Sequence, residues 1–587
     1  MTATGDLTPT RGPLPDLAAQ DRVFRFLEDP RTYPYTVEDL EVFETHISRV
    51  VLAGPFAYKA KKAVHFDFLD YSTVAKRRYF CEEEIRLNRR LAPDVYCDVV
   101  SVQQVGGALR LVLEGPNSDH EVEPVVRMKR VLPDATLAHR VASGTATRSD
   151  LDSLVALLCP FYERAERFTA GDGPGSPQVV RKILEENHAS LESGAPDPRK
   201  PGRLQAIRSR QLSFLELHQD LFESRLHDGW VRDGHGDLRA EHVVYLPQCA
   251  VLDCVEFNKD YRVVDILSDL AFLRMDLESL GAPELGEHLV ERYAARSGCP
   301  VDPDLLEFYT SYRAFVRAKV DALRAAQTET DGSERARLLK RSDDYLDLSL
   351  SHAQNLPRPP LVTVGGLSGS GKSTLAKRLA SRLGAPLLRS EEIRKEIAGH
   401  PPTYRPRKED GLYTPAHTEK TYRTVAERAR DWLHVGAGVV VDATFSRREH
   451  RNAYRNLGEQ EGVRRIHFEC RVAPEEAARR MHSRASEGND PSDAVPDLQQ
   501  DLTATYEPCL EGEAIRLDTA SPPEQVEEDA LHEMREHRTS TSPGATEAGA
   551  TEASPTEASA TEAGAKGDKP GTHCAAKNIP KTRKTPR

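Results

Sequence analysis

Long apolar runs are absent from this 587-residue sequence. No stretch approaches the roughly 20 apolar residues that a helix needs to cross a bilayer. The first residues also lack the basic-then-apolar pattern of a secretory signal. We therefore expect a cytoplasmic protein with no membrane association.

Paired cysteines are also lacking. The nine cysteines are odd in number and scattered, and the only close pair, Cys249 and Cys254, lacks metal-site spacing. This favours reduced thiols over a disulfide framework or a zinc site. The net charge of −12 is unlike that of a nucleic-acid coat, which is strongly basic.

The chain is too long for one hydrophobic core, so at least two domains are expected. We predict disorder over residues 1–20, a first domain over 21–355, a Pro-rich linker over 356–360 and a second domain over 361–525. From residue 538 the composition collapses to small and polar residues, including a five-residue repeat that begins TEAGA. Such a tail, 538–587, cannot bury enough apolar surface to order itself.

Patterning gives the two halves different fold classes. In the first half, strands are predicted at 46–53, 56–64, 99–103, 109–114 and 125–130, with a helix over 72–91. Helices follow from residue 149, interrupted by a strand-rich island at 229–257. This indicates an α+β domain with two lobes. The second half alternates strands and helices, which is typical of an α/β domain with a parallel sheet.

A glycine-rich phosphate-binding loop opens the second domain. Residues 362–374 read VTVGGLSGSGKST, an apolar strand followed by the pattern G-x-x-x-x-G-K-[ST] and a helix. Its glycines let backbone N–H groups surround a phosphate, and the helix N-terminus adds a positive dipole end. Lys372 would neutralise the β- and γ-phosphates of ATP, and Ser373 would ligate Mg²⁺. The predicted ATP-binding residues are Gly366, Ser368, Gly369, Ser370, Gly371, Lys372, Ser373 and Thr374.

Further candidates lie downstream of this loop. Asp442 ends an apolar strand, as expected for an acidic group near Mg²⁺. Glu391 and Arg394 follow the predicted strand at 386–388, at the sheet edge where ligands bind in open α/β folds. Arg484, with two arginines upstream, lies on a helix that would close over the phosphates, although a solvated basic face is an equally good interpretation.

On these residues the region resembles P-loop small-molecule and polynucleotide kinases, including the polynucleotide 5′-kinases and zeta-toxin-like kinases. The resemblance covers residues 361–518. It implies that Glu391, followed by Arg394, activates or positions the acceptor hydroxyl. Those kinases usually have Asp where this chain has Glu391, so the acceptor geometry stays open.

The first domain carries a second candidate phosphate site. The motif His-Gly-Asp-Leu contains Asp237 and precedes a strand, and the next strand ends in Asp253. Two acids at the ends of neighbouring strands are what a protein-kinase-like site requires, one for the acceptor and one for Mg²⁺.

This region resembles the aminoglycoside phosphotransferase-type kinases, which have a protein-kinase-like fold. The resemblance implies that Asp237 is the catalytic base and Asp253 a metal ligand, with His242 replacing the asparagine that holds a second metal. It also implies that Lys59 binds phosphate and that Glu84 pairs with it, although neighbouring lysines and glutamates compete for both roles. The whole chain resembles bacterial two-domain proteins that fuse such a domain to a P-loop kinase.

Three functions are compatible with these motifs. The first is an ATP- and Mg²⁺-dependent kinase that phosphorylates a hydroxyl of a small molecule, or less favourably a nucleic-acid 5′-hydroxyl. In the second, the first domain is a pseudokinase that binds a ligand and regulates the P-loop domain. The third is an NTPase switch, which would need no acceptor residues such as Glu391. The substrate and the oligomeric state stay open.

Overall fold

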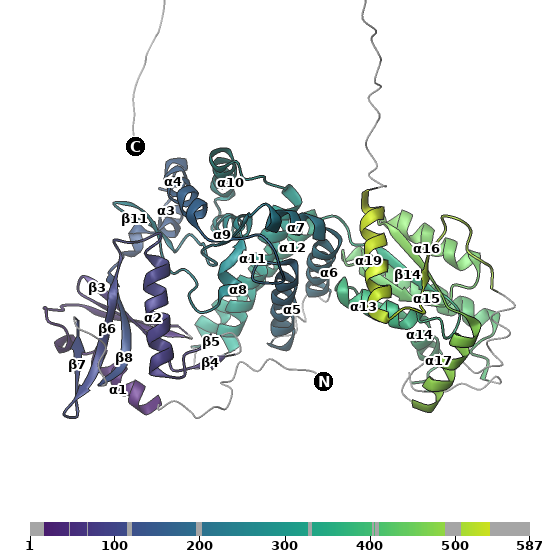
Figure 1. Cartoon of the computed structure of the whole chain (residues 1–587), viewed down its shortest axis with the longest axis horizontal. Helices are drawn as coiled ribbons and strands as arrows, with labels where there is room; N and C mark the ends of the chain where they lie inside the picture. The colour runs from purple at the N-terminus through teal and green to yellow at the C-terminus, as the bar shows by residue number, and fades with distance from the viewer. Residues whose placement is uncertain are drawn as a thin grey trace, which may run out of the picture. The chain divides into compact units, whose positions relative to one another are not determined.

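The computed structural model describes residues 17–45, 47–66, 69–113, 120–194, 202–326, 331–401, 404, 410–487 and 506–539. They form two domains, an α+β domain with two lobes and an α/β domain (Figure 1). The expected disorder of residues 1–16 and of the tail from 540 lies outside the described residues. Helix α1 (Leu17–Leu27) begins inside the segment 1–20 that was expected to be disordered.

The first lobe is built on a six-stranded antiparallel sheet in the order β1-β2-β3-β8-β6-β7. Val125 and Val126 are neighbours in β8, so their side chains point to opposite faces of the sheet. Val125 packs in the cluster that includes α1, and Val126 packs with helix α2 (Val74–Asn88). The strands are β1 (Leu40–Glu44), β2 (Ser48–Ala53), β3 (Phe56–Lys61), β6 (Tyr96–Val105), β7 (Ala108–Val112) and β8 (Glu121–Lys129).

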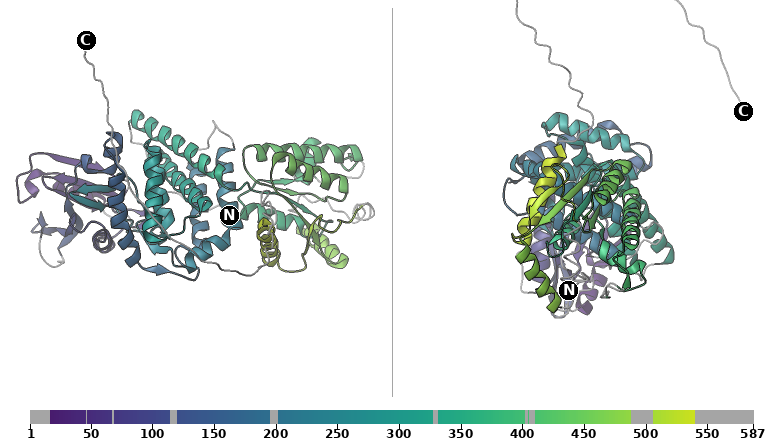
Figure 2. Two further views of the ribbon diagram at one scale, coloured as in Figure 1. Left: turned by 90° about the horizontal axis from the view of Figure 1, so that it is seen from above. Right: turned by 90° about the vertical axis from the view of Figure 1, so that its right-hand side faces the viewer.

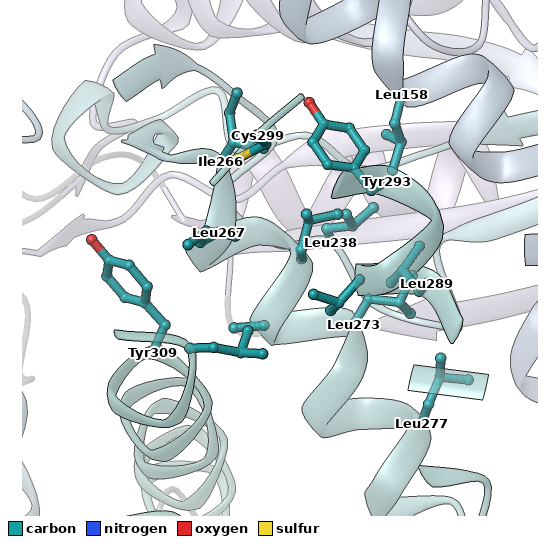
Figure 3. Packing of buried hydrophobic residues seen from close by; sticks show 14 of the residues in the cluster. Leu158, Leu238, Ile266, Leu267, Leu273, Leu277, Leu289, Tyr293, Cys299 and Tyr309 are labelled. Carbon is teal, nitrogen blue, oxygen red and sulfur yellow. The ribbon is translucent and has the colours of Figure 1, made fainter. Parts of the chain in front are cut away.

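The second lobe is mainly helical. Its core is a cluster of leucines and aromatic residues, and Figure 3 shows Leu273 and Leu277 of α9 beside Leu289 of α10. The helices are α3 (Leu137–Ala142), α4 (Arg148–Arg164), α5 (Pro177–Gly194), α6 (Arg203–Leu217), α7 (Gln219–His227), α8 (Lys259–Arg262), α9 (Ile266–Ser279), α10 (Pro283–Ser297), α11 (Pro303–Ala326) and α12 (Gly332–Asn355). Near the end of α12, His352 contacts Glu307 at 2.7 Å and Glu278 at 3.0 Å.

Short strands carry the candidate residues of this domain. The predicted island at 229–257 contains β10 (Val231–Asp233) and the hairpin β11 (Val243–Leu246) and β12 (Gln248–Val251). Strand β10 pairs with β13 (Val263–Asp265) and β9 (Arg167–Phe168). The remaining short elements are β4 (His65–Phe66), β5 (Leu69–Asp70), and the 3₁₀ turns η1 (Pro30–Thr32) and η2 (Pro133–Ala135).

The second domain has a five-stranded parallel sheet in the order β15-β16-β14-β17-β18, with helices on both faces (Figure 2). Val362 and Val364 of β14 pack with α13 and α19, whereas Leu361 packs with α15 and α16. Burial on both faces is typical of parallel sheets. The elements are β14 (Leu361–Gly365), α13 (Lys372–Arg382), β15 (Leu387–Arg389), α14 (Ser390–Ile397), α15 (Pro415–His434), β16 (Val439–Asp442), α16 (Arg448–Glu461), β17 (Arg465–Arg471), α17 (Pro474–Glu487), β18 (Ile515–Asp518) and α19 (Pro523–Thr539).

Helix α19 extends past the expected end of the second domain. Residue 525 lies inside this helix, whose Val526, Ala530, Leu531 and Met534 are buried against the sheet and α13. The apolar spacing of three to four residues marks this face, but the many charges around it make the segment look like the start of a polar tail.

Helix α6 of the first domain packs on α13 and α19 of the second. Its Glu216, with a 4% exposed side chain, accepts hydrogen bonds from Arg181, from Arg382 at 2.8 Å and from Arg535 at 2.8 Å. Leu217 belongs to the hydrophobic cluster of the P-loop domain. A buried carboxylate with three arginine partners is held in place, because separating it from them would leave a charge in a nonpolar setting.

In the described parts of the chain, every helix is too short or too polar to span a bilayer. The eight cysteines found there are all unpaired, as the sequence predicts.

Candidate functional site

The phosphate-binding loop connects β14 to α13. Gly371 is the N-cap of α13 with φ +83°, and Gly369 has φ +81°. A Cβ atom on Gly369 would lie 2.6 Å from the carbonyl oxygen of Ala477 in α17. Glycine is therefore required at this position both by backbone conformation and by the close approach of the next helix. Lys372 is the first residue of α13, at the positive end of its dipole.

A cavity of about 500 Å³ lies over this loop. One wall is the start of α13 and another is α17. A third comes from the segment between β18 and α19. The residues that line the cavity include Gly369, Gly371, Lys372, Ser373, Thr374, Lys377, Glu476, Arg479, Arg480, Thr519, Ser521 and Pro523. A volume of this size suits a nucleotide.

The walls of the cavity are joined by polar contacts. Arg480 of α17 donates to Glu476 at 2.6 Å and to the Thr519 carbonyl at 2.8 Å, and the Thr519 hydroxyl donates to the Ser370 carbonyl at 2.6 Å. Hydrogen bonds from Arg479 and Arg480 lower the pKa of Glu476 to about 2, so it is ionised at neutral pH. These contacts fix α17 against the phosphate loop.

Of the arginines predicted to close over the phosphates, Arg480 and Arg479 line this cavity. Arg484 lies in α17 by its backbone, but its side chain is outside the described residues. Its role therefore stays a prediction.

Asp442 ends β16, directly beside the phosphate loop. Its neighbours across the sheet are Val364 of β14 and Arg389 of β15. Its side chain is 5% exposed, and Oδ2 accepts a hydrogen bond from Arg389 at 3.2 Å. Within the described chain, Oδ1 is buried without a hydrogen-bond partner.

These residues fit a bound Mg²⁺. The buried Oδ1 of Asp442 is a hard anionic oxygen, the ligand type that Mg²⁺ prefers, and Ser373 is the second protein ligand that the sequence predicts. The described residues contain no cluster of three or more His, Cys, Asp or Glu that could hold a metal alone. In the usual Mg²⁺ site, substrate phosphates supply the remaining oxygens.

Glu391 and Arg394 lie one turn apart on α14, which begins directly after Arg389. Glu391 accepts a hydrogen bond from Tyr413 at 2.7 Å, and its other oxygen is 3.9 Å from Arg394. The Arg394 guanidinium also donates to the Leu412 carbonyl at 2.8 Å and lies over the Tyr413 ring. The structure thus brings the predicted acceptor pair together and adds Tyr413 to it.

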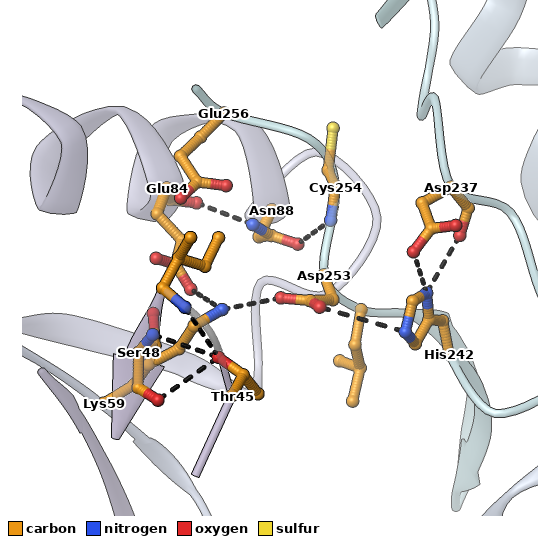
Figure 4. Close-up of polar contacts among 12 residues, drawn as sticks. Thr45, Ser48, Lys59, Glu84, Asn88, Asp237, His242, Asp253, Cys254 and Glu256 are labelled. Carbon is orange, nitrogen blue, oxygen red and sulfur yellow. Dashed lines mark hydrogen bonds and ion pairs between the residues drawn. The ribbon is translucent and has the colours of Figure 1, made fainter. Parts of the chain in front are cut away.

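In the first domain the structure brings Lys59, Glu84 and Asp253 into contact (Figure 4). Lys59 of β3 is 2.9 Å from Glu84 of α2 and 2.7 Å from Asp253. Burial opposes ionisation of Asp253, but the charge of Lys59 beside it holds its pKa well below the usual range. The backbone φ of Asp253 is +59°, a left-handed conformation that is uncommon for residues other than glycine.

Lys61 competes with Lys59 for the same glutamate. The Lys61 ammonium is fully buried, lies 2.7 Å from Glu84 and also contacts Glu256. Tyr71 donates to Glu256 at 2.7 Å. Two lysines two residues apart on one strand point the same way, so both reach Glu84. Only Lys59 also contacts Asp253, which favours Lys59 as the phosphate-facing lysine.

A buried carboxylate holds the backbone of the His-Gly-Asp loop. Asp269, at the start of α9, accepts the backbone N–H groups of His235 at 2.8 Å and Gly236 at 2.9 Å. Burial lowers the pKa of His235 to about 4, so its ring is neutral. This network fixes the backbone directly before Asp237.

The carboxylate of Asp237 is already paired. Arg239 donates to its two oxygens at 2.9 and 3.1 Å. His242 donates from Nδ1 to the Asp237 carbonyl at 2.8 Å, which leaves Nε2 to accept from Arg239 at 3.1 Å. Nε2 is also 3.8 Å from Asp253. Figure 4 shows His242 between the two acids. A metal at His242 would have to displace Arg239 from Nε2.

Several of these neighbours were not found from the sequence: Arg389, Tyr413, Thr519 and Arg239. Arg389 and Arg239 sit two residues from predicted site residues, so their spacing was a usable signal. Tyr413 and Thr519 are separated by many residues from the groups that they contact, and only the tertiary fold brings them there.

The fold and the loop cavity define the second domain as a P-loop nucleotide-binding domain, next to a two-lobed α+β domain. A family model described as an AAA domain matches residues 361–509. The chain belongs to the same family as the uncharacterized protein Rv2004c of Mycobacterium tuberculosis. The two are 33% identical over 511 residues, which cover 86% of this chain and 97% of that protein. The uncharacterized protein Mb2027c of Mycobacterium bovis matches with the same values.

Two solved structures resemble parts of the chain. A gluconokinase from Sinorhizobium meliloti is 23% identical, covers 31% of this chain and 94% of its own, and has a TM-score of 0.23. A choline/ethanolamine kinase family protein from Mesorhizobium loti is 12% identical, covers 57% of this chain and 99% of its own, and has a TM-score of 0.32.

Proposed function

We propose that the second domain is an ATP-dependent phosphotransferase that moves the γ-phosphoryl group to a hydroxyl of a small molecule or nucleotide. One observation carries the proposal. The phosphate loop follows β14, the buried free oxygen of Asp442 lies at the end of β16, and Glu391, which Tyr413 contacts, follows β15, so all three belong to neighbouring strands of one sheet. A pure NTPase switch needs the first two but not the third.

Each residue has a distinct role in this proposal. The backbone N–H groups of the loop and Lys372 hold the phosphates, and α17 brings Arg480 to the same cavity. Ser373 and Asp442 would hold Mg²⁺, which when bound neutralises the charge that develops on the phosphates. Glu391 accepts the proton of the acceptor hydroxyl. The hydroxyl oxygen then bonds to the γ-phosphorus as the bond between the γ-phosphorus and ADP breaks. Tyr413 and Arg394 orient Glu391.

The test is transfer of label from [γ-³²P]ATP to a pool of sugars, metabolites and nucleosides by the full-length protein. We expect Lys372→Ala to reduce labelled product by about 10²–10³-fold, the usual loss when one charge-stabilising group is removed. Lys420→Ala, an exposed lysine on α15, serves as the matched control and should keep full activity. ATP binding without any labelled product would contradict the proposal.

A second candidate function concerns the first domain. Arg239 occupies both oxygens of Asp237, and Lys59 is paired with Asp253. These ion pairs favour a pseudokinase that binds a ligand and regulates the P-loop domain. Asp237→Asn should then leave labelled product unchanged in the assay above. Loss of all transfer in Asp237→Asn would instead assign the chemistry to the first domain.

A further inference from the structure

A second cavity, of about 520 Å³, lies in the helical lobe of the first domain. Helices α9, α11 and α12 form its walls, and the segment after Asp237 forms part of its rim. Arg239, which holds Asp237, is one of the lining residues. A ligand in this cavity would therefore touch the residue that neutralises Asp237.

The acidic groups that line this cavity already have partners. Asp344 pairs with Lys340 at 2.7 Å, and Asp347 pairs with Arg203 at 2.8 Å. Glu241 pairs with Arg239. Their negative charge is thus matched by the protein and leaves little attraction for a cationic ligand.

Asp276 completes the acidic lining. It is 7% exposed and accepts the backbone N–H of Ala240 at 2.8 Å. Burial raises the pKa of Asp276, which weakens its negative charge further. Its carboxyl group is better suited to hydrogen bonding with a hydroxyl than to pairing with a cation.

Unlike the paired acidic residues of this lining, the cation Arg317 has no close ion-pair partner in the described parts of the chain. Its nearest carboxylate, Asp321, is 3.9 Å away. Both oxygens of Asp321 are taken by Arg341, at 2.5 and 2.6 Å. The Arg317 side chain is 12% exposed, and its Nε has no hydrogen-bond partner among the described residues. An arginine with a weak partner and unused donors is suited to an anionic oxygen.

The two serines in the lining supply hydroxyl oxygens. Ser279 and Ser351 each donate to a main-chain carbonyl within their own helix, at 2.8 Å. Their lone pairs stay available to accept hydrogen bonds from a ligand. The cavity thus combines one incompletely paired cation with several hydroxyl-binding groups.

We propose that this cavity binds a small polyol that carries a phosphate or carboxylate group, with Arg317 as the anion anchor. This proposal is independent of the phosphotransferase assigned to the P-loop domain, because none of the lining residues belongs to that domain. The ligand would contact Arg239, which holds the carboxylate of Asp237.

The test is isothermal titration calorimetry on the full-length protein carrying Lys372→Ala, which weakens phosphate binding at the P-loop. The probes are ribose 5-phosphate, gluconate and neutral ribose. At least one of the two anions should bind with a stoichiometry near one, and ribose should not. A preference for ribose 5-phosphate identifies phosphate as the recognised group, and a preference for gluconate identifies carboxylate.

Arg317→Gln in the same background should weaken binding of the anion at least tenfold. Arg317→Lys keeps the charge, so its affinity for the anion should lie between those of the Lys372→Ala protein and of the Arg317→Gln variant. This intermediate affinity guards against a folding defect in the glutamine variant. Arg324→Gln, an exposed arginine on the same helix, is the matched control and should bind normally. The proposal is overturned if neither anion binds, if ribose binds equally well, or if both Arg317 variants keep full affinity.

Discussion

Replacing Gly369 by alanine tests whether the cavity over the phosphate loop is the nucleotide site. The substitution has two separable costs. An alanine at φ +81° costs about 1–2 kcal/mol in the left-handed conformation. In addition, its Cβ would lie 2.6 Å from the Ala477 carbonyl, and this distance must lengthen to the ordinary range, which begins at 3.4 Å. Because the obstacle is backbone, α17 itself has to move.

Moving α17 changes the wall that carries Arg480 and its contact with Thr519. If this costs the bound state about 2 kcal/mol, a typical effect of local strain, the Kd for Mg-AMPPNP rises about 30-fold. Isothermal titration calorimetry on the full-length protein measures this Kd. Gly298→Ala is the matched control, because Gly298 has φ +72° and nothing within 4 Å of the added Cβ.

The control should lose about 1–2 kcal/mol of unfolding free energy, as the strain alone requires, and bind nucleotide like the wild type. Gly369→Ala should lose at least as much stability and, in addition, nucleotide affinity. If Gly369→Ala binds Mg-AMPPNP as tightly as the control, the nucleotide does not occupy this cavity and the reasoning fails.

Three further predictions concern the domain contact, pH and metal. Glu216→Gln should lower the free energy of unfolding by about 3 kcal/mol in thermal denaturation, whereas the half-exposed Glu528 changed to Gln should cost less than about 1 kcal/mol. Burial works against His352, but its two glutamate partners raise its pKa above 6.5. Its contribution to stability is therefore full below pH 6.5 and lost as pH rises through the raised pKa, and a melting-temperature profile of His352→Gln should lack that loss. Asp442→Asn should weaken Mg²⁺ binding in the presence of ATP by about 10–100-fold, as measured by magnesium titration, while metal-free ATP binding stays unchanged.

The elements of the second domain were largely predictable from the sequence, because its buried parallel strands are continuous apolar runs. The phosphate loop also has a local pattern that specifies both a turn and a helix start. In the first domain, strand β1 was missed. Its residues are mostly exposed, including Val42 and Phe43, so the alternation that marks a half-buried strand is absent.

The candidate sites were predictable to a smaller extent. Residues on one strand or helix, such as Lys59 and Glu84, could be proposed from spacing, but three lysines and three glutamates fitted equally well. The choice between them depends on which side chain reaches Asp253 from another part of the chain. Likewise, the pairing of Asp237 by Arg239 depends on side-chain direction within one loop, which residue spacing does not determine.

The most direct test of the phosphotransferase is ³¹P NMR of the full-length protein with Mg-ATP and the metabolite pool. We expect ADP to form together with an equal amount of a new phosphomonoester. This signal should persist in Asp237→Asn and be lost in Lys372→Ala. Formation of ADP with free phosphate alone, at a rate that is the same with and without the pool, would contradict the proposed phosphotransferase activity.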